Sequence, residues 1–334
     1  RRKRLYTGYE SPGPTRCGYF TLTLEPLKRI IGKYKGNRPG PLLVITAGMH
    51  GNEPAGIRAL ETLFRMLEEE PIRNPDFTYC GEIIGITGNL RACKMGRRYI
   101  SRDINRAWEV GHIKNIMQAE KASLIDEDLE MRDIIDTIST EISMLTPDHL
   151  YLLDLHTTSA DGGIFCIATG EAESIRIAHE IHAPVILGLL QGISGTTLHF
   201  FNQNNLGIPA TAIAFEGGKH DDPLSVNRCI AATINFMRAI RVIQPADVDN
   251  HHDELLKKYS EGLPDIVEVI FRHHVEDVAK WQMRPGYYNF RPVDKDEVLA
   301  MYDGLPVRAE TDGLILMPLY HNEGHDGYFI VRQA

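Results

Sequence analysis

Hydrophobic and polar positions divide the first 245 residues into alternating segments of two kinds. Short apolar runs have the length of buried strands, whereas longer segments repeat their apolar residues every three or four positions, as one face of a helix does. We expect strands over 42–47, 82–87, 150–155 and 211–215, and helices from Pro54 onward and over 129–142 and 227–243. This alternation is typical of an α/β fold with a mixed, mainly parallel central sheet flanked by helices.

The pattern changes after residue 245. Charged residues are frequent over 253–261, and the later apolar runs are short and separated by Pro285-Gly286, Asp303-Gly304 and Asp312-Gly313. Such dipeptides favour turns between strands. We therefore expect two domains, a large α/β domain over 1–245 and a small β-rich C-terminal domain over 246–334.

Composition excludes several classes of function. The 334 residues carry a formal net charge of −9, which disfavours a general nucleic-acid binder, because phosphate contacts need a basic surface. No apolar run approaches the length of a membrane span, and the basic residues 1–4 are most simply a solvated terminus. The five cysteines show no C-x-x-C spacing, so we expect inert reduced thiols in a cytoplasmic protein. A small-molecule substrate is expected, with no nucleic-acid or membrane partner, and homo-oligomerisation stays open.

Two histidines and a glutamate lie where predicted strands end. His50 and Glu53 form an H-x-x-E in the turn between a strand and a helix. His156 follows the strand over 150–155, and Asp154 shares its strand face and could orient its imidazole. These segments meet at one edge of an open α/β sheet, and two histidines with a carboxylate form a common catalytic zinc site. H-x-x-E alone is a weak signal, however, and isolated histidines are more often satisfied surface or core residues.

Other polar residues could complete a site around such a metal. Asn105 and Arg106 offer an amide and a guanidinium fork that suit a substrate carboxylate, and Arg98 could stabilise an oxyanion. Glu216 follows the strand over 211–215 and precedes two glycines, so it is a candidate general base. Taken singly, the arginine segment also fits a basic surface loop, and Glu216 also fits a cap or an ion pair.

Together, these segments resemble the succinylglutamate desuccinylase/aspartoacylase family, a branch of the metallocarboxypeptidase-like zinc hydrolases. Four motifs of that family occur in order between about residues 40 and 245: G-x-H-G-N-E at Gly48 to Glu53, R…D-[LI]-N-R at Arg98 and Asp103 to Arg106, D-L-H-x-T-x at Asp154 to Ser159, and E-x-G at Glu216 to Gly218. The segments 289–293 and 312–318 are also similar to the small β domain that these enzymes carry.

The resemblance implies a zinc-dependent hydrolase that cleaves the amide bond of an N-acyl amino acid, with one Zn²⁺ per chain. Metal-activated water would attack the amide carbonyl. The resemblance assigns the metal to His50, Glu53 and His156, proton transfer to Glu216, oxyanion support to Arg98, and the substrate carboxylate to Asn105 and Arg106.

Two positions depart from the family's pattern. Where aspartoacylases place an arginine after a Thr-Thr pair, to bind a second carboxylate, this chain has Leu198 after Thr196 and Thr197. The tyrosine that assists from the C-terminal domain has no aligned equivalent, although Tyr328 is nearby. We therefore expect a less acidic N-acyl amino acid or a related amide as substrate. The alternatives are a metallocarboxypeptidase acting on short peptides and, less favoured, a non-catalytic ligand-binding protein on the same scaffold.

Overall fold

The computed structural model describes residues 26–248 and 251–334, so the basic residues 1–4 and Cys17 lie outside the described part of the chain. Strands of its first part are β1 (Ile30–Lys35), β2 (Arg38–Ala47), β3 (Cys80–Thr87), β4 (Leu150–Thr158), β5 (Phe165–Ala168), β6 (Val185–Leu187) and β7 (Ala210–Lys219). Strands of its last part are β8 (Ile266–His274), β9 (Trp281–Met283), β10 (Pro292–Val293), β11 (Val298–Tyr302), β12 (Leu305–Arg308), β13 (Gly313–Leu316) and β14 (Asp326–Gln333).

Helices connect these strands. The α-helices are α1 (Ala55–Arg73), α2 (Leu90–Met95), α3 (Val110–Gln118), α4 (Asp126–Leu145), α5 (Ala172–Glu180), α6 (Leu189–Gly192), α7 (Thr197–Phe200), α8 (Gln203–Leu206), α9 (Leu224–Ala239) and α10 (His251–Tyr259). Short 3-10 turns are η1 (Ile104–Arg106), η2 (Lys121–Ser123), η3 (Pro245–Asp247) and η4 (Val278–Lys280).

Among the described residues, eleven strands form one sheet in the order β1-β3-β2-β4-β7-β5-β6-β8-β14-β13-β10. Its central strands β3, β2, β4 and β7 are neighbours and run parallel, whereas β5 lies antiparallel to β7. The mixed, mainly parallel sheet predicted from the sequence is thereby confirmed. Parallel neighbours need crossover connections, which the intervening helices supply.

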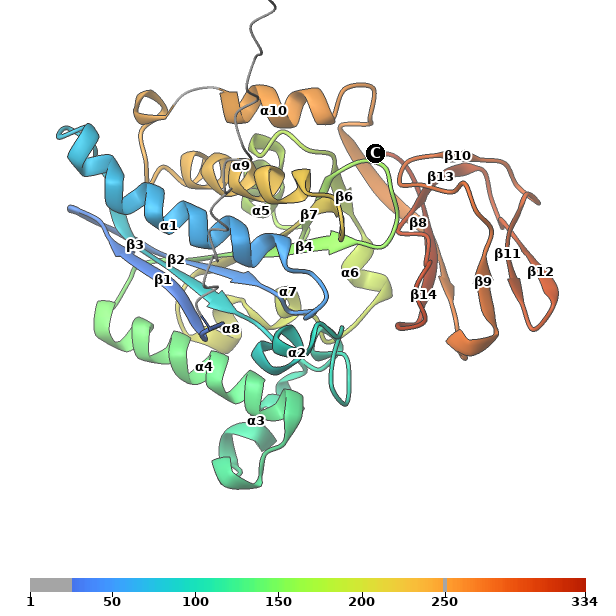
Figure 1. Ribbon diagram of the computed structural model, residues 1–334, viewed down its shortest axis with the longest axis horizontal. Helices are drawn as coiled ribbons and strands as arrows, with labels where there is room; N and C mark the ends of the chain where they lie inside the picture. Colours follow the sequence, from blue (N-terminus) through green and yellow to red (C-terminus); the bar gives the residue numbers. More distant parts are fainter. Residues whose placement is uncertain (1–25, 249–250) are drawn as a thin grey trace, which may run out of the picture.

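Helices cover both faces of this sheet (Figure 1). On one face lie α1, α5, α9 and α10, and on the other lie α3 and α4. Alternate residues of β2 feed the two cores: Leu43 and Ile45 pack under α1 and α9, whereas Leu42 and Val44 pack on the opposite side. The near-continuous apolar run of β2 is therefore explained by burial on both faces.

Several predicted boundaries were wrong, among them the end of the strand expected over 150–155, which continues to Thr158 and so includes His156. The helix expected over 227–243 ends at Ala239, because Arg241 adopts a left-handed conformation with φ 60° and Ile243 instead bridges to Tyr79. The strand expected to stop before Glu216 continues to Lys219, because β7 is paired with both β4 and β5 at Glu216 and with β4 again at Lys219. Glu216 therefore lies within the strand, opposite His156 of β4.

The C-terminal segment adds strands of its own. Among the described residues, β9, β11 and β12 form a separate antiparallel sheet, which packs on a core containing Trp281, Leu299 and Tyr328. This β-rich lobe lies at one end of the molecule in Figure 1. β8 pairs with β6, so the large sheet runs from the first part of the chain into the last. A domain boundary at 245 remains a prediction. Within the described residues, no helix combines the length and apolarity that a membrane crossing requires.

Candidate active site

Neighbouring parallel strands bring the predicted site residues to one edge of the sheet. The loop after β2 carries His50 and Glu53, β4 carries His156, and β7 carries Glu216. In the register, Ala47 lies opposite Leu155, and His156 lies opposite Glu216. This edge is formed by the carboxyl ends of the strands, where ligands bind in open α/β sheets.

Glycines allow the loop after β2 to turn sharply. Gly48 has φ +69°, a conformation that other residues adopt at a cost. At Gly51, a Cβ atom would lie 2.2 Å from the carbonyl carbon of Ala92, so no side chain fits between this loop and α2. The backbone NH of Gly51 also donates to the carbonyl of Arg98 at 3.1 Å. The loop is thus held against the segment that supplies the arginine.

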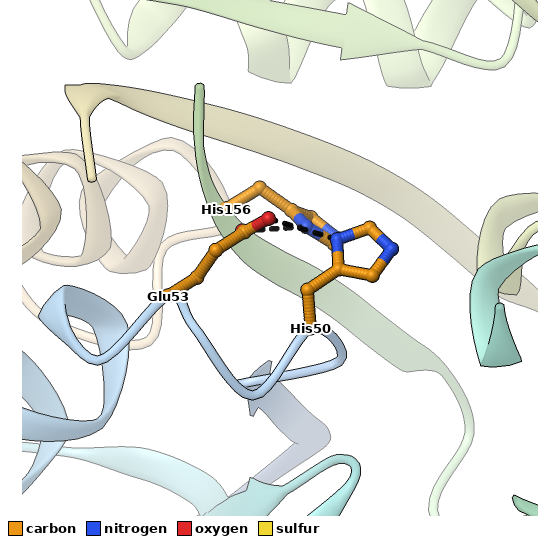
Figure 2. A group of neighbouring side chains, drawn as sticks. All are labelled: His50, Glu53 and His156. Atoms are coloured by element: carbon orange, nitrogen blue, oxygen red, sulfur yellow. Dashed lines mark hydrogen bonds and ion pairs between the residues drawn. The ribbon is translucent and has the colours of Figure 1, made fainter. Parts of the chain in front are cut away.

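His50, Glu53 and His156 form a compact group (Figure 2). Glu53 Oε1 lies 2.8 Å from His50 Nδ1, and its Oε2 lies 3.2 Å from His156 Nδ1. One ligand atom from each residue lies within 4.8 Å of the others, and each residue is at most 5% exposed. Two imidazole nitrogens and a carboxylate suit a divalent ion such as zinc.

The charge state of Glu53 also suits a metal ligand. Burial alone would raise the pKa of Glu53, but the charge of His50 and hydrogen bonds with both imidazoles hold it well below the ordinary value. The backbone NH of Thr157 adds a hydrogen bond to Oε2 at 3.0 Å. Glu53 is therefore an ionised carboxylate at neutral pH, the form that binds metal ions.

A second carboxylate lies behind each imidazole. His50 Nε2 is 3.0 Å from Asp103 Oδ1, and His156 Nε2 is 3.0 Å from Asp154 Oδ2. The second contact has an ion-pair distance without the alignment of a hydrogen bond, and Thr46 and Thr197 donate to Asp154. Such partners fix ring orientation in metal sites, so both Nδ1 atoms face Glu53. Sequence reasoning gave Asp154 this role but gave none to Asp103.

Arg98, in the loop after α2, and Glu216, in β7, lie beside the His-Glu-His group. Arg98 Nη2 lies 3.1 Å from Asp103, and its Nη1 lies 3.7 Å from Glu53 Oε1. Glu216 is 5% exposed, and its Oε2 has no hydrogen-bond partner among the described residues. Burial raises the pKa of Glu216 to about 8. A carboxyl group near that pKa can exchange a proton at neutral pH.

Asn105 and Arg106 also reach the cavity, but both already have partners. Asn105 Oδ1 accepts the backbone NH of Thr197 at 2.9 Å, while its Nδ2 makes no hydrogen bond to the described residues. Arg106 donates to the carbonyl of Asn105 at 2.8 Å and to Asp326 Oδ2 at 2.6 Å. Asp326 of β14 thus places a carboxylate beside the two residues predicted to bind the substrate carboxylate. The sequence did not indicate this contact.

One cavity of about 780 Å³ is lined by the His-Glu-His group, Arg98, Asp103, Asn105, Arg106, Glu216 and Asp326, whereas Asp154 lies buried behind its wall. Two further histidines lie in its wall: His220 at the end of β7 and His321 in the loop before β14. Their ring centroids are 6.3 Å apart, His220 Nδ1 contacts the hydroxyl of Thr157 at 2.8 Å, and burial lowers the pKa of His321 to about 4. His220 follows Glu216 by four residues, a proximity that could have drawn attention to it. His321 gave no such signal.

Comparison with known proteins identifies the family. Residues 39–240 match the family model described as the succinylglutamate desuccinylase/aspartoacylase catalytic domain. The chain belongs to the succinylglutamate desuccinylase/aspartoacylase family. A succinylglutamate desuccinylase from Pseudomonas aeruginosa is 33% identical over 261 residues, which cover 73% of this chain and 72% of that protein.

Other relatives agree with this family. A succinylglutamate desuccinylase from Photorhabdus laumondii is 29% identical over 40% of this chain, and the match spans only 37% of that relative's length. The crystal structure of a succinylglutamate desuccinylase/aspartoacylase from Rhodobacter sphaeroides has a TM-score of 0.62 at 18% identity, covering 90% of this chain and 87% of that one, and shows the same fold. The family consists of hydrolases that act on acyl amino acids.

Two positions predicted to depart from the pattern of the succinylglutamate desuccinylase/aspartoacylase family can be located in the structure. Leu198 lines the cavity where the sequence comparison expected an arginine, and the described chain places no charged group at that position of α7. Tyr328 is fully buried in the β-rich lobe, donates to the carbonyl of Arg308 at 3.3 Å, and does not line the cavity. From the same lobe, His321 reaches the cavity instead.

Proposed function

We propose that this protein is a zinc-dependent hydrolase that cleaves the amide bond of an N-acyl amino acid or a related small amide. The observation that supports it most is a buried His-Glu-His group that shares one cavity with Glu216, whose Oε2 has no hydrogen-bond partner among the described residues. His50, Glu53 and His156 would hold one zinc ion per chain. When bound, zinc supplies Lewis acidity, which lowers the pKa of water and polarises a carbonyl.

Glu216 moves the proton in this proposal. Its free Oε2 accepts a proton from the attacking water and then returns it to the nitrogen of the leaving amine. Its raised pKa suits both steps, because the carboxyl group gains and loses a proton near neutral pH.

Arg98 and the pair Asn105 and Arg106 hold the substrate in place. The buried guanidinium of Arg98 is fixed by Asp103 and stabilises the negative charge that develops on the carbonyl oxygen. Asn105 Nδ2 and Arg106 bind the carboxylate of the amino-acid half, which sets the scissile amide between the metal group and Glu216. These roles agree with those that the family's motifs imply.

Hydrolysis of a mixed panel by mass spectrometry tests the proposal. Zinc-loaded protein is incubated with N-acetyl, N-succinyl and N-formyl amino acids and with short peptides, beside Glu216→Gln and the matched surface control Glu68→Gln. We expect release of free amino acids by the parent and the control, and a loss of about 10²- to 10⁴-fold in Glu216→Gln. The zinc content of Glu216→Gln should stay at one per chain. Equal turnover by Glu216→Gln would remove this residue from the mechanism, and cleavage of peptides alone would favour a carboxypeptidase.

A further inference from the structure

One wall of the cavity is apolar and begins beside Glu216. Ala214 precedes Glu216 by two residues on β7 and therefore shares its face of the sheet. Ile167 of β5 lies opposite Ala214 in the antiparallel register, and both side chains line the cavity. The surface next to the proton-handling carboxyl group is thus formed by small and aliphatic side chains.

Short helices complete this wall. Leu189 and Leu190 of α6, the following Ile193, and Leu198 of α7 all line the same cavity. We call the six side chains the apolar recess: Ile167, Leu189, Leu190, Ile193, Leu198 and Ala214. Because aliphatic groups make no directional hydrogen bond, a recess of this composition favours an apolar ligand group and disfavours a carboxylate.

The recess lies beside the residues proposed to bind the substrate carboxylate. Asn105 accepts the backbone NH of Thr197, next to Leu198, at 2.9 Å. The backbone NH of Trp108 donates to the carbonyl of Gly195 at 3.0 Å, which joins the same two segments again. The recess therefore adjoins the proposed carboxylate site, and the side chain of an amino acid branches from the carbon that bears its carboxylate.

The ion pairs around Asp326 leave one positive charge in the cavity that a substrate carboxylate can neutralise. Asp326 lies 2.6 Å from Arg106 Nη2 and 2.7 Å from Arg272 Nε, so one negative charge is shared by two guanidinium groups. Arg272 also donates to the carbonyl of Gly192, at the edge of the recess. The three charged groups carry a net charge of +1, which one substrate carboxylate neutralises.

The remaining arginines of the cavity wall are also paired. Arg98 contacts Asp103, and Arg102 contacts Asp128. Across the described residues that line the cavity, four arginines face six carboxyl groups. Each of these arginines thus already has an acidic partner, and the aliphatic wall offers a second substrate carboxylate no hydrogen bond.

We infer that the substrate carries a single carboxylate and that its amino-acid side chain is apolar, of the size of leucine, and occupies the apolar recess. This inference rests on the proposed hydrolysis and adds the class of amino acid. Leu198 is the position at which a charged side chain would change this specificity most directly, because it lines the cavity from α7, which packs against the strand that carries Ala214 and Glu216.

Paired substrates test the inference on the unmodified zinc-loaded protein. N-acetyl-leucine and N-acetylaspartate both branch at the γ position, so they differ in charge more than in shape. We expect kcat/KM for N-acetyl-leucine to be at least about 100-fold higher than kcat/KM for N-acetylaspartate. It should also be at least about tenfold higher than kcat/KM for N-acetylalanine. A preference for N-acetylaspartate would overturn the inference while leaving the proposed hydrolysis intact.

Substitution at the recess tests its location. In Leu198→Arg, the ratio of the two kcat/KM values should shift toward N-acetylaspartate by at least about tenfold, whereas Leu305→Arg, on an exposed side chain of β12, should leave it unchanged. Ile193→Lys changes a half-buried position of the same wall and keeps the test available if Leu198→Arg does not fold. An unchanged ratio in a folded recess variant would overturn the assignment.

A binding measurement separates the two proposals. Calorimetry with Glu216→Gln gives the Kd of each N-acetyl amino acid without turnover, and we expect N-acetyl-leucine to bind at least about tenfold more tightly than N-acetylaspartate. Failure of the parent to hydrolyse any substrate, with this binding preference retained, would overturn the hydrolysis and keep the recess. Equal or reversed affinities would overturn the recess.

Discussion

Glu53 is the residue around which the candidate metal group is organised. Its two carboxylate oxygens contact different histidines, and the backbone NH of Thr157 fixes one of them. The surrounding charges keep it ionised although it is 3% exposed. A buried carboxylate with cationic or metal partners is stable, whereas one without them is costly. The side chain of Glu53 is therefore both a proposed metal ligand and a contact that holds the loop after β2 against β4.

Removal of one imidazole should remove the metal. His156→Ala is expected to lose tightly bound zinc, because one of three ligands is absent and Asp154 no longer has an imidazole to orient. Zinc content after dialysis, measured by mass spectrometry, checks this expectation, and circular dichroism confirms that the variant is folded. His179→Ala, at an exposed histidine paired with Asp265, is the matched control and should keep its zinc. Full zinc occupancy in His156→Ala would exclude His156 as a ligand.

At the scale of elements, the sequence predicted the buried strands and long helices well. The strands β2, β3, β4 and β7 carry apolar runs that are buried on both faces, and α1 has an apolar stripe. The continuous runs and the helical repeat of apolar residues could therefore both be recognised in the sequence. The short elements α6, α7 and α8 were missed, because four residues are too few to show a helical period. Of these elements, α6 and α7 carry three residues of the apolar recess, Leu189, Leu190 and Leu198, which explains why the recess was not predicted.

The 3-10 turn η1 links the metal group to the substrate residues. Asp103 caps this turn by accepting the backbone NH of Asn105 at 2.9 Å, and the same carboxylate contacts His50 and Arg98. One side chain thus sets the position of a proposed ligand, of the proposed oxyanion group and of the turn that bears Asn105. This arrangement gives a physical reason for the aspartate in the second motif.

Loss of that charge should weaken zinc binding without abolishing it. We expect Asp103→Asn, which keeps the shape of the side chain, to raise the Kd for zinc by about 10- to 100-fold, because His50 loses its orienting carboxylate. Competition with a chromophoric chelator measures this Kd. Asp76→Asn, at an exposed position, should leave it unaltered. If Asp103→Asn bound zinc like the parent, the contact with His50 would have no part in holding the metal.

At the scale of the whole molecule, the cavity is completed by residues far apart in sequence. Arg106 and Asp326 are separated by 220 positions, and His321 and Arg272 also come from the last part of the chain. The motifs could be recognised because each is local, whereas these pairings depend on how β8 and β14 extend the sheet. A pattern of apolar and polar residues carries no information about which distant charge will meet which.

The Asp326 ion pairs should make the stability of the molecule depend on pH in acid. Arg106 and Arg272 hold the pKa of Asp326 below its ordinary value despite burial, which alone would raise it. A carboxyl group with a depressed folded pKa stabilises the folded state above its unfolded pKa of about 3.9, and this contribution is lost as pH falls through the folded pKa. The stabilisation is therefore full at pH 7, begins to decrease at about pH 4, and is lost as the pH falls through the lower pKa of the folded state.

Urea unfolding of Asp326→Asn beside the parent measures this contribution. At pH 7 we expect the variant to be about 2 kcal/mol less stable, because two charge-assisted hydrogen bonds between mostly buried groups are lost, and the difference should shrink as the pH falls below about 4. Asp303→Asn is the matched control from the same lobe. Its pair with Lys280 is exposed to solvent, so this substitution should leave the stability nearly unchanged at any pH. A difference for Asp326→Asn that stayed constant down to pH 3 would mean that its effect comes from packing, and that the charge of Asp326 does not join the C-terminal strands to the cavity.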